Sequence, residues 1–95
     1  NRTSKVTVEA DGRSNTFDLA SVGANILDAG MANGVELPYS CKAGVCSTCK
    51  AKLIKGQVDM DISHGLEQHE IDAGYILTCQ SHPISDEVVV SFDER

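Results

Sequence analysis

Four cysteines are the residues of this chain whose type and spacing point most directly to chemistry. Cys41, Cys46 and Cys49 follow one another as Cys-x4-Cys-x2-Cys, and Cys79 comes after a gap of 29 residues. A cysteine thiolate is a strong ligand for soft metal ions, and a cysteine thiol can also form a disulfide. Three cysteines within one short segment are far from a chance distribution, so their side chains are expected to meet at a shared centre.

The spacing of the cysteines is typical of a [2Fe–2S] cluster held by four thiolates. A loop that wraps such a cluster must approach it closely and aim backbone N–H groups at its sulfides. The segment supplies small residues for that purpose, namely Ala43, Gly44, Ser47 and Thr48. Gly44 is the natural position for a positive φ in the wrap. The sequence therefore predicts a [2Fe–2S] cofactor with Cys41, Cys46, Cys49 and Cys79 as its metal ligands.

Two other uses of these cysteines remain open at this point. A structural zinc site usually pairs two Cys-x2–4-Cys knuckles, whereas Cys79 has no cysteine beside it. Two disulfides would suit a small secreted protein, but no signal peptide opens the sequence. The iron–sulfur interpretation explains the spacing better than either alternative.

Other polar residues near the cysteines have less specific patterns. Ser40, Ser47 and Thr48 either donate hydrogen bonds to cluster sulfur or simply fit the loop. The three histidines are expected at the surface, because four cysteines already complete a ligand set; they are His64, His69 and His82. An acidic stretch either steers a basic redox partner or forms a solvated face; it comprises Asp59, Asp61, Glu67, Glu70 and Asp72. Several lysines close to the cluster loop make the charge distribution uneven.

The elements that position the cysteines follow from hydrophobic periodicity. Alternating or β-branched patterns predict strands over residues 5–9, 14–19, 51–55, 75–78 and 87–92. Asp11-Gly12 predicts a hairpin turn, and helices are expected over residues 24–32 and 66–73. Gly34 falls where a left-handed C-cap would end the first helix, and residues 38–49 form a loop. Mixed strands and short helices over this length indicate one α+β domain spanning residues 1–95.

Composition excludes several classes of function. The 95 residues include 14 acidic and 8 basic side chains, for a net charge of −6, which disfavours binding to nucleic acid or to an anionic membrane. No apolar run is long enough to span a bilayer. A cytoplasmic monomer is expected. The core must be mainly aliphatic, because the chain has no Trp, and a small core often relies on a metal.

Three segments closely resemble the plant-type [2Fe–2S] ferredoxin family. Residues 38–49 resemble its cluster loop, residues 74–79 its fourth-ligand strand, and residues 82–86 the segment behind that strand. A weaker similarity at residues 27–29 extends the resemblance over most of the chain. The resemblance implies a β-grasp fold, a mixed sheet crossed by one main helix, with the cluster near the surface at one end. It also implies one-electron transfer at a low potential, around −400 mV in such centres.

Within that family, the chain is closer to the C-terminal ferredoxin domain of bacterial oxygenase reductases of the phenylacetyl-CoA epoxidase reductase type. Residues 65–70 lack the aromatic-plus-acid run of photosynthetic ferredoxins. This type implies a flavin-containing reductase module as electron donor and an oxygenase or similar redox protein as acceptor. The domain itself would be a carrier rather than an enzyme. Because residue 1 is Asn, a domain excised from a larger flavin-containing reductase is expected, with a trimmed standalone ferredoxin as the alternative. A β-grasp binding module with a purely structural metal is the alternative of a different class.

Overall fold

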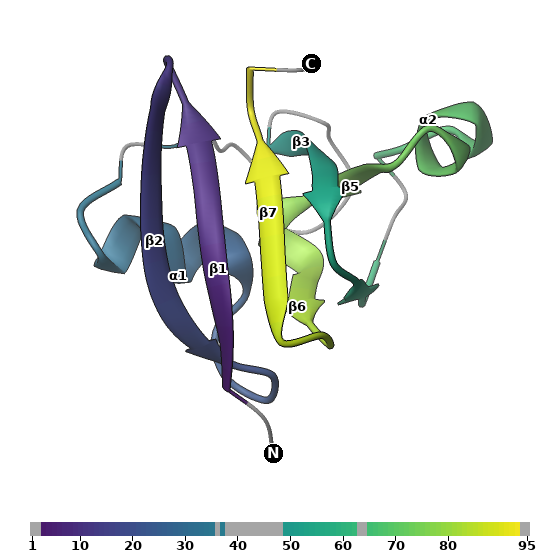
Figure 1. Cartoon of the computed structure of the whole chain (residues 1–95). Coiled ribbons are helices and arrows are strands. Elements are labelled where there is room, and N and C mark those ends of the chain that lie inside the picture. Colours follow the sequence, from purple (N-terminus) through teal and green to yellow (C-terminus); the bar gives the residue numbers. More distant parts are fainter. Residues whose placement is uncertain (1–2, 36, 38–48, 63–64, 94–95) are drawn as a thin grey trace.

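A five-stranded mixed sheet forms the centre of the computed structural model, which describes residues 3–35, 37, 49–62 and 65–93. Its strands lie in the order β2-β1-β7-β3-β5 (Figure 1). β1 pairs in parallel with β7, whereas the other neighbouring strands are antiparallel. The strand bounds are β1 Thr3–Ala10, β2 Arg13–Ala20, β3 Lys50–Lys55, β5 Tyr75–Leu77 and β7 Glu87–Ser91. All five predicted strands are confirmed, with ends that differ by at most two residues.

A second, two-stranded sheet was not predicted from the sequence. It pairs β4 (Val58–Met60) with β6 (Ser81–Pro83) in antiparallel fashion. Three residues are too few to display a period of two, so neither strand has a recognisable sequence pattern. Between β5 and β6 the chain forms a single 3₁₀ turn, η1 (Thr78–Gln80), so the predicted strand over residues 75–78 stops one residue early.

The main helix, α1 (Ile26–Ala32), lies across one face of the sheet behind β1 and β2 (Figure 1). It begins two residues later than predicted because Asn25 is the N-cap, accepting a hydrogen bond from the Asp28 backbone N–H at 2.8 Å. Gly34 has the left-handed φ of +86° that was predicted for the residue ending this helix. The helix therefore has a well-defined start and stop.

The second helix, α2 (Gln68–Asp72), is shorter than the predicted 66–73 and buries none of its residues. A capping box between Glu67 and Glu70 fixes its start. It projects from the side of the sheet that carries β5 (Figure 1). No helix in the described ranges is both long and apolar enough to cross a membrane.

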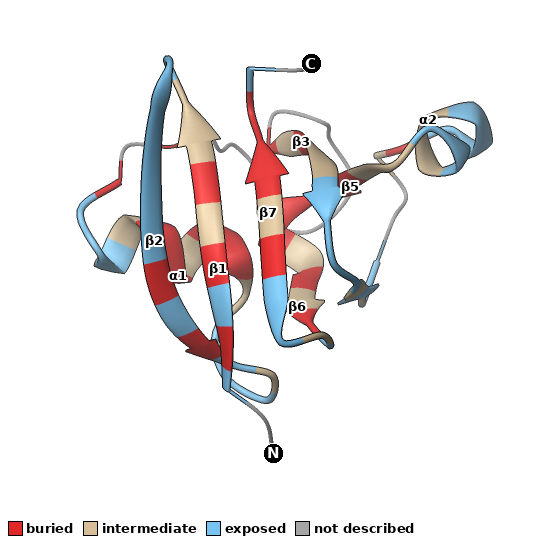
Figure 2. Cartoon of the chain, in the orientation of Figure 1, coloured by how far each residue is buried: buried red, intermediate tan, exposed pale blue. Residues whose placement is uncertain are grey.

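The core lies between the sheet and α1. Val6 and Val8 of β1 are fully buried and stand in register with Val88 and Val90 of β7, which are equally buried. The residues that alternate with them are more exposed, namely Lys5, Thr7 and Val89, and this alternation produces the banding in Figure 2. Ile26 and Leu27 of α1 close the other side of this core without solvent exposure. A small aliphatic core was expected from the composition, and this is its position.

Candidate metal centre

Cys49 and Cys79 meet because the strands next to them pair. Cys49 directly precedes β3, and Cys79 lies in η1 just after β5. β3 and β5 run antiparallel with Lys50 opposite Leu77, so the start of one strand lies beside the end of the other. The two sulfur atoms lie 3.2 Å apart, and each cysteine is only 3% exposed. The fold thus brings together two predicted ligands that are 30 positions apart in the sequence.

Cys49 and Cys79 are free thiols and form no disulfide with each other. A disulfide would require about 2.05 Å between the sulfurs. Two buried sulfurs at 3.2 Å can instead contact one metal ion together. In the described part of the chain, no third Cys, His, Asp or Glu joins them in a metal-binding group. The pair fits half of a four-thiolate ligand set.

The remaining predicted site residues lie outside the described residues. These are Cys41 and Cys46, the loop residues Ser40, Ala43, Gly44, Ser47 and Thr48, and also His64. Some were predicted as metal ligands, some as hydrogen-bond donors to cluster sulfur and some as loop residues that wrap the cluster. These roles stay predictions.

Two buried hydroxyl groups hold the cysteine segments in place, and sequence reasoning missed both. Thr78 donates its Oγ1 hydrogen to the carbonyl oxygen of Cys49 at 2.8 Å, which ties the two cysteine segments together. Ser81 donates its hydroxyl to the carbonyl oxygen of Leu77 at 2.8 Å and closes the turn around Cys79. Both residues are fully buried. Their positions on either side of Cys79 were the only available sequence signal.

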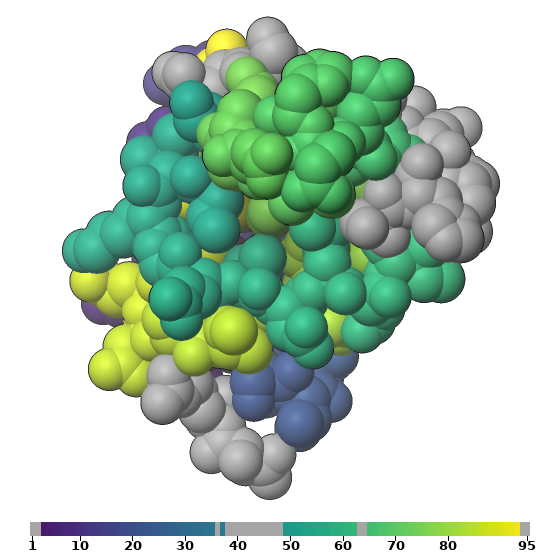
Figure 3. Space-filling model, turned by 90° about the vertical axis from the view of Figure 1, so that its right-hand side faces the viewer, coloured from purple at the N-terminus to yellow at the C-terminus, as the bar shows by residue number. Residues whose placement is uncertain are grey.

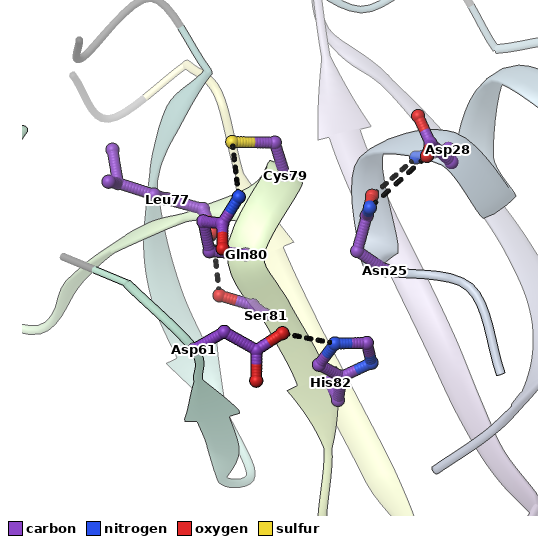
Figure 4. A network of polar contacts seen from close by, with 8 residues as sticks. All are labelled: Asn25, Asp28, Asp61, Leu77, Cys79, Gln80, Ser81 and His82. Atoms are coloured by element: carbon purple, nitrogen blue, oxygen red, sulfur yellow. Dashed lines mark hydrogen bonds and ion pairs between the residues drawn. The ribbon is translucent and has the colours of Figure 1, made fainter. Parts of the chain in front are cut away.

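The side chain of Gln80 folds back onto the sulfur of Cys79. Its Nε2 lies 3.9 Å from the Cys79 Sγ, and the close-up view in Figure 4 shows the amide nitrogen turned toward that sulfur. The sequence alone gives no sign of this contact, because a glutamine beside a cysteine has no pattern of its own.

The histidine prediction is confirmed for His69, whose side chain is 77% exposed. His82 is more enclosed, with 23% of its side chain exposed and its Nε2 at 3.0 Å from Asp61 Oδ2 (Figure 4). Its Nδ1 is buried and has no hydrogen-bond partner within the described residues. His82 links β6 to the end of β4 and is therefore a structural residue rather than a freely solvated one.

Charge beside the cysteine pair is more balanced than the acidic sequence stretch suggested. Lys50, next to Cys49, forms a 2.7 Å ion pair with Glu70 of α2. The pKa of the Glu70 carboxyl is lowered, first by the hydrogen bond from the Glu67 backbone N–H and then by Lys50. Lys50 and Lys52 also lie 5.2 and 5.8 Å from the centre of the Tyr75 ring. Figure 3 shows α2 standing out on this side of the molecule, beside the strand that carries the lysines.

The class of protein follows from this site together with a family comparison. Residues 8–83 match the model of the 2Fe-2S iron-sulfur cluster binding domain. The chain belongs to this family, and it is a β-grasp ferredoxin domain whose cofactor is a [2Fe–2S] cluster and whose function is electron transfer. The predicted cofactor and fold class are thereby confirmed, and the zinc and plain binding-module alternatives fall away.

Particular relatives refine the picture. The chain is 47% identical to a component of the 1,2-phenylacetyl-CoA epoxidase of Escherichia coli K12, covering 96% of this chain but 26% of that protein. It is 40% identical to Ferredoxin-2 of a Synechococcus strain, covering 88% of this chain and 79% of the relative. Among solved structures, the Amycolatopsis cytochrome P450 reductase GcoB superposes with a TM-score of 0.78 at 33% identity, covering 93% of this chain and 25% of that one. The chain thus spans about a quarter of the length of the epoxidase component and of GcoB.

Proposed function

We propose that Cys41, Cys46, Cys49 and Cys79 hold the cluster, and that the domain passes single electrons from a flavin-containing reductase module to an oxygenase or another redox protein. The observation that carries this proposal is the pair of buried, free thiols at 3.2 Å, contributed by the start of β3 and by η1. This pair would supply two of the four ligands. Cys41 and Cys46, the first two cysteines of the Cys-x4-Cys-x2-Cys spacing, would supply the other two.

The described residues suit this role by fixing two ligands and excluding water from them. When bound, the cluster supplies reversible one-electron chemistry. Burial of Cys49 and Cys79 keeps water from their sulfurs, and the bond from Thr78 to the Cys49 carbonyl holds the two segments at a constant separation. Ligands held in this way need little rearrangement when the charge changes. The low-dielectric surroundings also oppose an added negative charge, which favours a low potential.

The reductase-type relatives support a flavin-containing donor in the same polypeptide. Residues 1–95 would then be one domain of a larger NAD(P)H-dependent reductase, carrying electrons but performing no substrate chemistry itself. A tethered donor acts at a high effective concentration and needs little electrostatic steering. The neutralisation of Glu70 by Lys50, and the presence of Gln68 and His69 on α2, agree with a weakly steered surface. A cytoplasmic location and a monomeric state belong to the same proposal.

A standalone ferredoxin is the second candidate. It is favoured by the match to Ferredoxin-2 of Synechococcus, most of whose length the chain covers. In that case the donor would be a separate reductase that finds the acidic surface by diffusion.

Two measurements test the proposal. Purified protein should be brown, contain about two iron and two sulfide per chain, and bleach with dithionite; a colourless protein containing zinc would refute it. Reduction by a separate ferredoxin reductase should be slow and depend weakly on salt if the natural donor is tethered. A fast reaction that collapses as salt rises would instead identify a free, electrostatically steered carrier.

A further inference from the structure

The amide of Gln80 occupies a position from which it can act on one cluster ligand. Its Nε2 is 3.9 Å from the sulfur of Cys79, within range of an N–H···S hydrogen bond. A thiolate can only accept hydrogen bonds, so the amide N–H₂ rather than the amide oxygen must face it. Figure 4 shows this orientation, with the Gln80 nitrogen directed at the Cys79 sulfur.

The backbone beneath Gln80 is fixed on both sides. The carbonyl oxygen of Gln80 accepts a hydrogen bond from the Asp61 backbone N–H at 2.9 Å, which anchors it to the end of β4. The Ser81 hydroxyl donates to the carbonyl oxygen of Leu77, and the Ser81 backbone N–H donates to the carbonyl oxygen of Thr78. These two bonds fix the end of η1. A donor on an anchored backbone loses less conformational entropy when it bonds to the sulfur than a donor on a free loop. The geometry is therefore built into the turn.

The effect of such a bond depends on the redox state. Reduction adds one negative charge to the cluster and its thiolates, so the sulfurs become better hydrogen-bond acceptors. A donor facing a ligand sulfur therefore stabilises the reduced state more than the oxidised state and raises the reduction potential. Because the Cys79 sulfur is almost fully buried, water competes little for it.

We propose that Gln80 raises the reduction potential of the domain through its hydrogen bond to the sulfur of Cys79. This inference rests on the proposed role of Cys79 as a cluster ligand. It adds to that role a hydrogen-bond donor that is positioned to act on the cluster through this ligand. The observation behind it is the contact between the Gln80 side-chain nitrogen and a proposed ligand sulfur.

The test compares two glutamine variants by redox titration. Gln80→Met keeps the length of the side chain but removes the donor, whereas Gln57→Met makes the same chemical change at an exposed position between β3 and β4. Gln80→Met should disfavour reduction about threefold, a decrease of about 28 mV, since tenfold is 59 mV for a one-electron couple. Gln57→Met should match the wild type. Resonance Raman Fe–S stretching bands should shift less in D₂O for Gln80→Met than for either of the others.

The possible outcomes separate this proposal from the one it rests on. A wild-type protein without a [2Fe–2S] spectrum would overturn the proposed function itself. A normal cluster in Gln80→Met, with wild-type potential and wild-type D₂O shift, would overturn only the role of Gln80. Loss of the cluster in both Gln80→Met and Gln80→Leu would also overturn it, because Gln80 would then support the fold of η1 rather than the potential.

Discussion

The two halves of this domain differ in how much regular structure holds them together. The sheet core, made of β1, β2, β7 and α1, has long strand ladders and fully buried aliphatic side chains such as Val6 and Val90. The cysteine corner, made of Cys49, β5 and η1, has a three-residue strand and a single 3₁₀ turn. Its segments are joined by hydrogen bonds from Thr78 and Ser81 to backbone carbonyls.

This difference indicates that the two regions depend on the cluster to different degrees. Apolar burial stabilises the sheet core whatever the redox or metal state, because it depends on area removed from water. Each hydrogen bond in the cysteine corner contributes only about 1 kcal/mol net. The corner also buries Ile76 and Leu77, but it has far shorter strand ladders than the sheet core. We therefore expect it to depend on the cluster as a further cross-link more than the sheet core does. Each of the following predictions tests that contrast.

Replacing a proposed ligand should have the largest effect. Cys79→Ala removes one of the two thiolates in the buried pair, so we expect the visible absorbance of the cluster and its iron to be lost. Thr16→Ala, an exposed change on β2, should keep both. Full absorbance in Cys79→Ala would show that this cysteine is not a ligand.

Removing the cluster should loosen one half of the molecule only. We expect the apo protein to melt at least about 10 °C below the holo protein, since 1 kcal/mol shifts the melting temperature of a domain this size by about 4–8 °C. Amide hydrogen exchange should accelerate in β5 and η1 while β1 and β7 stay protected. Uniform loss of protection, or equal melting temperatures, would contradict this difference between the two regions.

Truncating the sheet core should lower stability without weakening the cluster site directly. Val90→Ala removes two buried methyl groups at a fully enclosed position and should cost about 2 kcal/mol of unfolding free energy. The reduction potential should not change. Chemical denaturation and redox titration measure the two quantities, and a shifted potential would show that the halves are coupled.

Thr78→Val should affect the cluster site more than the overall stability of the protein. It keeps the shape of a buried side chain but leaves the Cys49 carbonyl with one hydrogen bond fewer, at a cost of about 1 kcal/mol. Because that bond joins the two cysteine segments, the cluster should be lost faster to an iron chelator. Thr16→Val on β2 provides the control, and an unchanged cluster lifetime in Thr78→Val would show that the bond does not position the cysteines.

The smallest expected effect is on the stability of the folded protein at acidic pH. The folded-state pKa of Glu70 is lowered from 4.5, so its interactions stabilise the protein above that pH and are lost as the pH falls through the lowered value. Glu70→Gln should therefore flatten the acid limb of the stability curve below about pH 4.5. Glu87→Gln, at a more exposed pair with Lys55, should do so less. Equal acid limbs in Glu70→Gln and wild type would refute this contribution.

The sequence predicted the sheet core better than the cysteine corner, because long strands display a hydrophobic period and three-residue elements do not. Alternation in β1 and the valine run of β7 are long enough to display a period, and the Asp11-Gly12 turn has the positive φ values its type requires. β4, β6 and η1 have three residues each and depend on partners distant in the sequence. Local pattern contains no information about such pairing.

At the site, the cysteines were predicted by their chemistry, but the residues that hold them were not. Thr78 bonds to a carbonyl 29 positions away, and the bonding of Ser81 to Leu77 depends on the turn between them. Threonine and serine are too common beside strand ends for their type alone to mark such roles. The side chain of Gln80 reaches the Cys79 sulfur only because η1 turns it back onto that residue.

The place of β7 in the sheet has a consequence for synthesis of the chain on the ribosome. β7 follows every other strand in the sequence, yet it is inserted between β1 and β3 and is the strand that joins the N-terminal hairpin to the cysteine-bearing strands. All four cysteines are therefore translated before the sheet can close. Such long-range pairing is slow to form, so nascent chains should expose thiols that await a finished scaffold. Cluster delivery is then best timed after residues 87–91 have left the ribosome, which makes completion of the sheet a checkpoint for cofactor insertion.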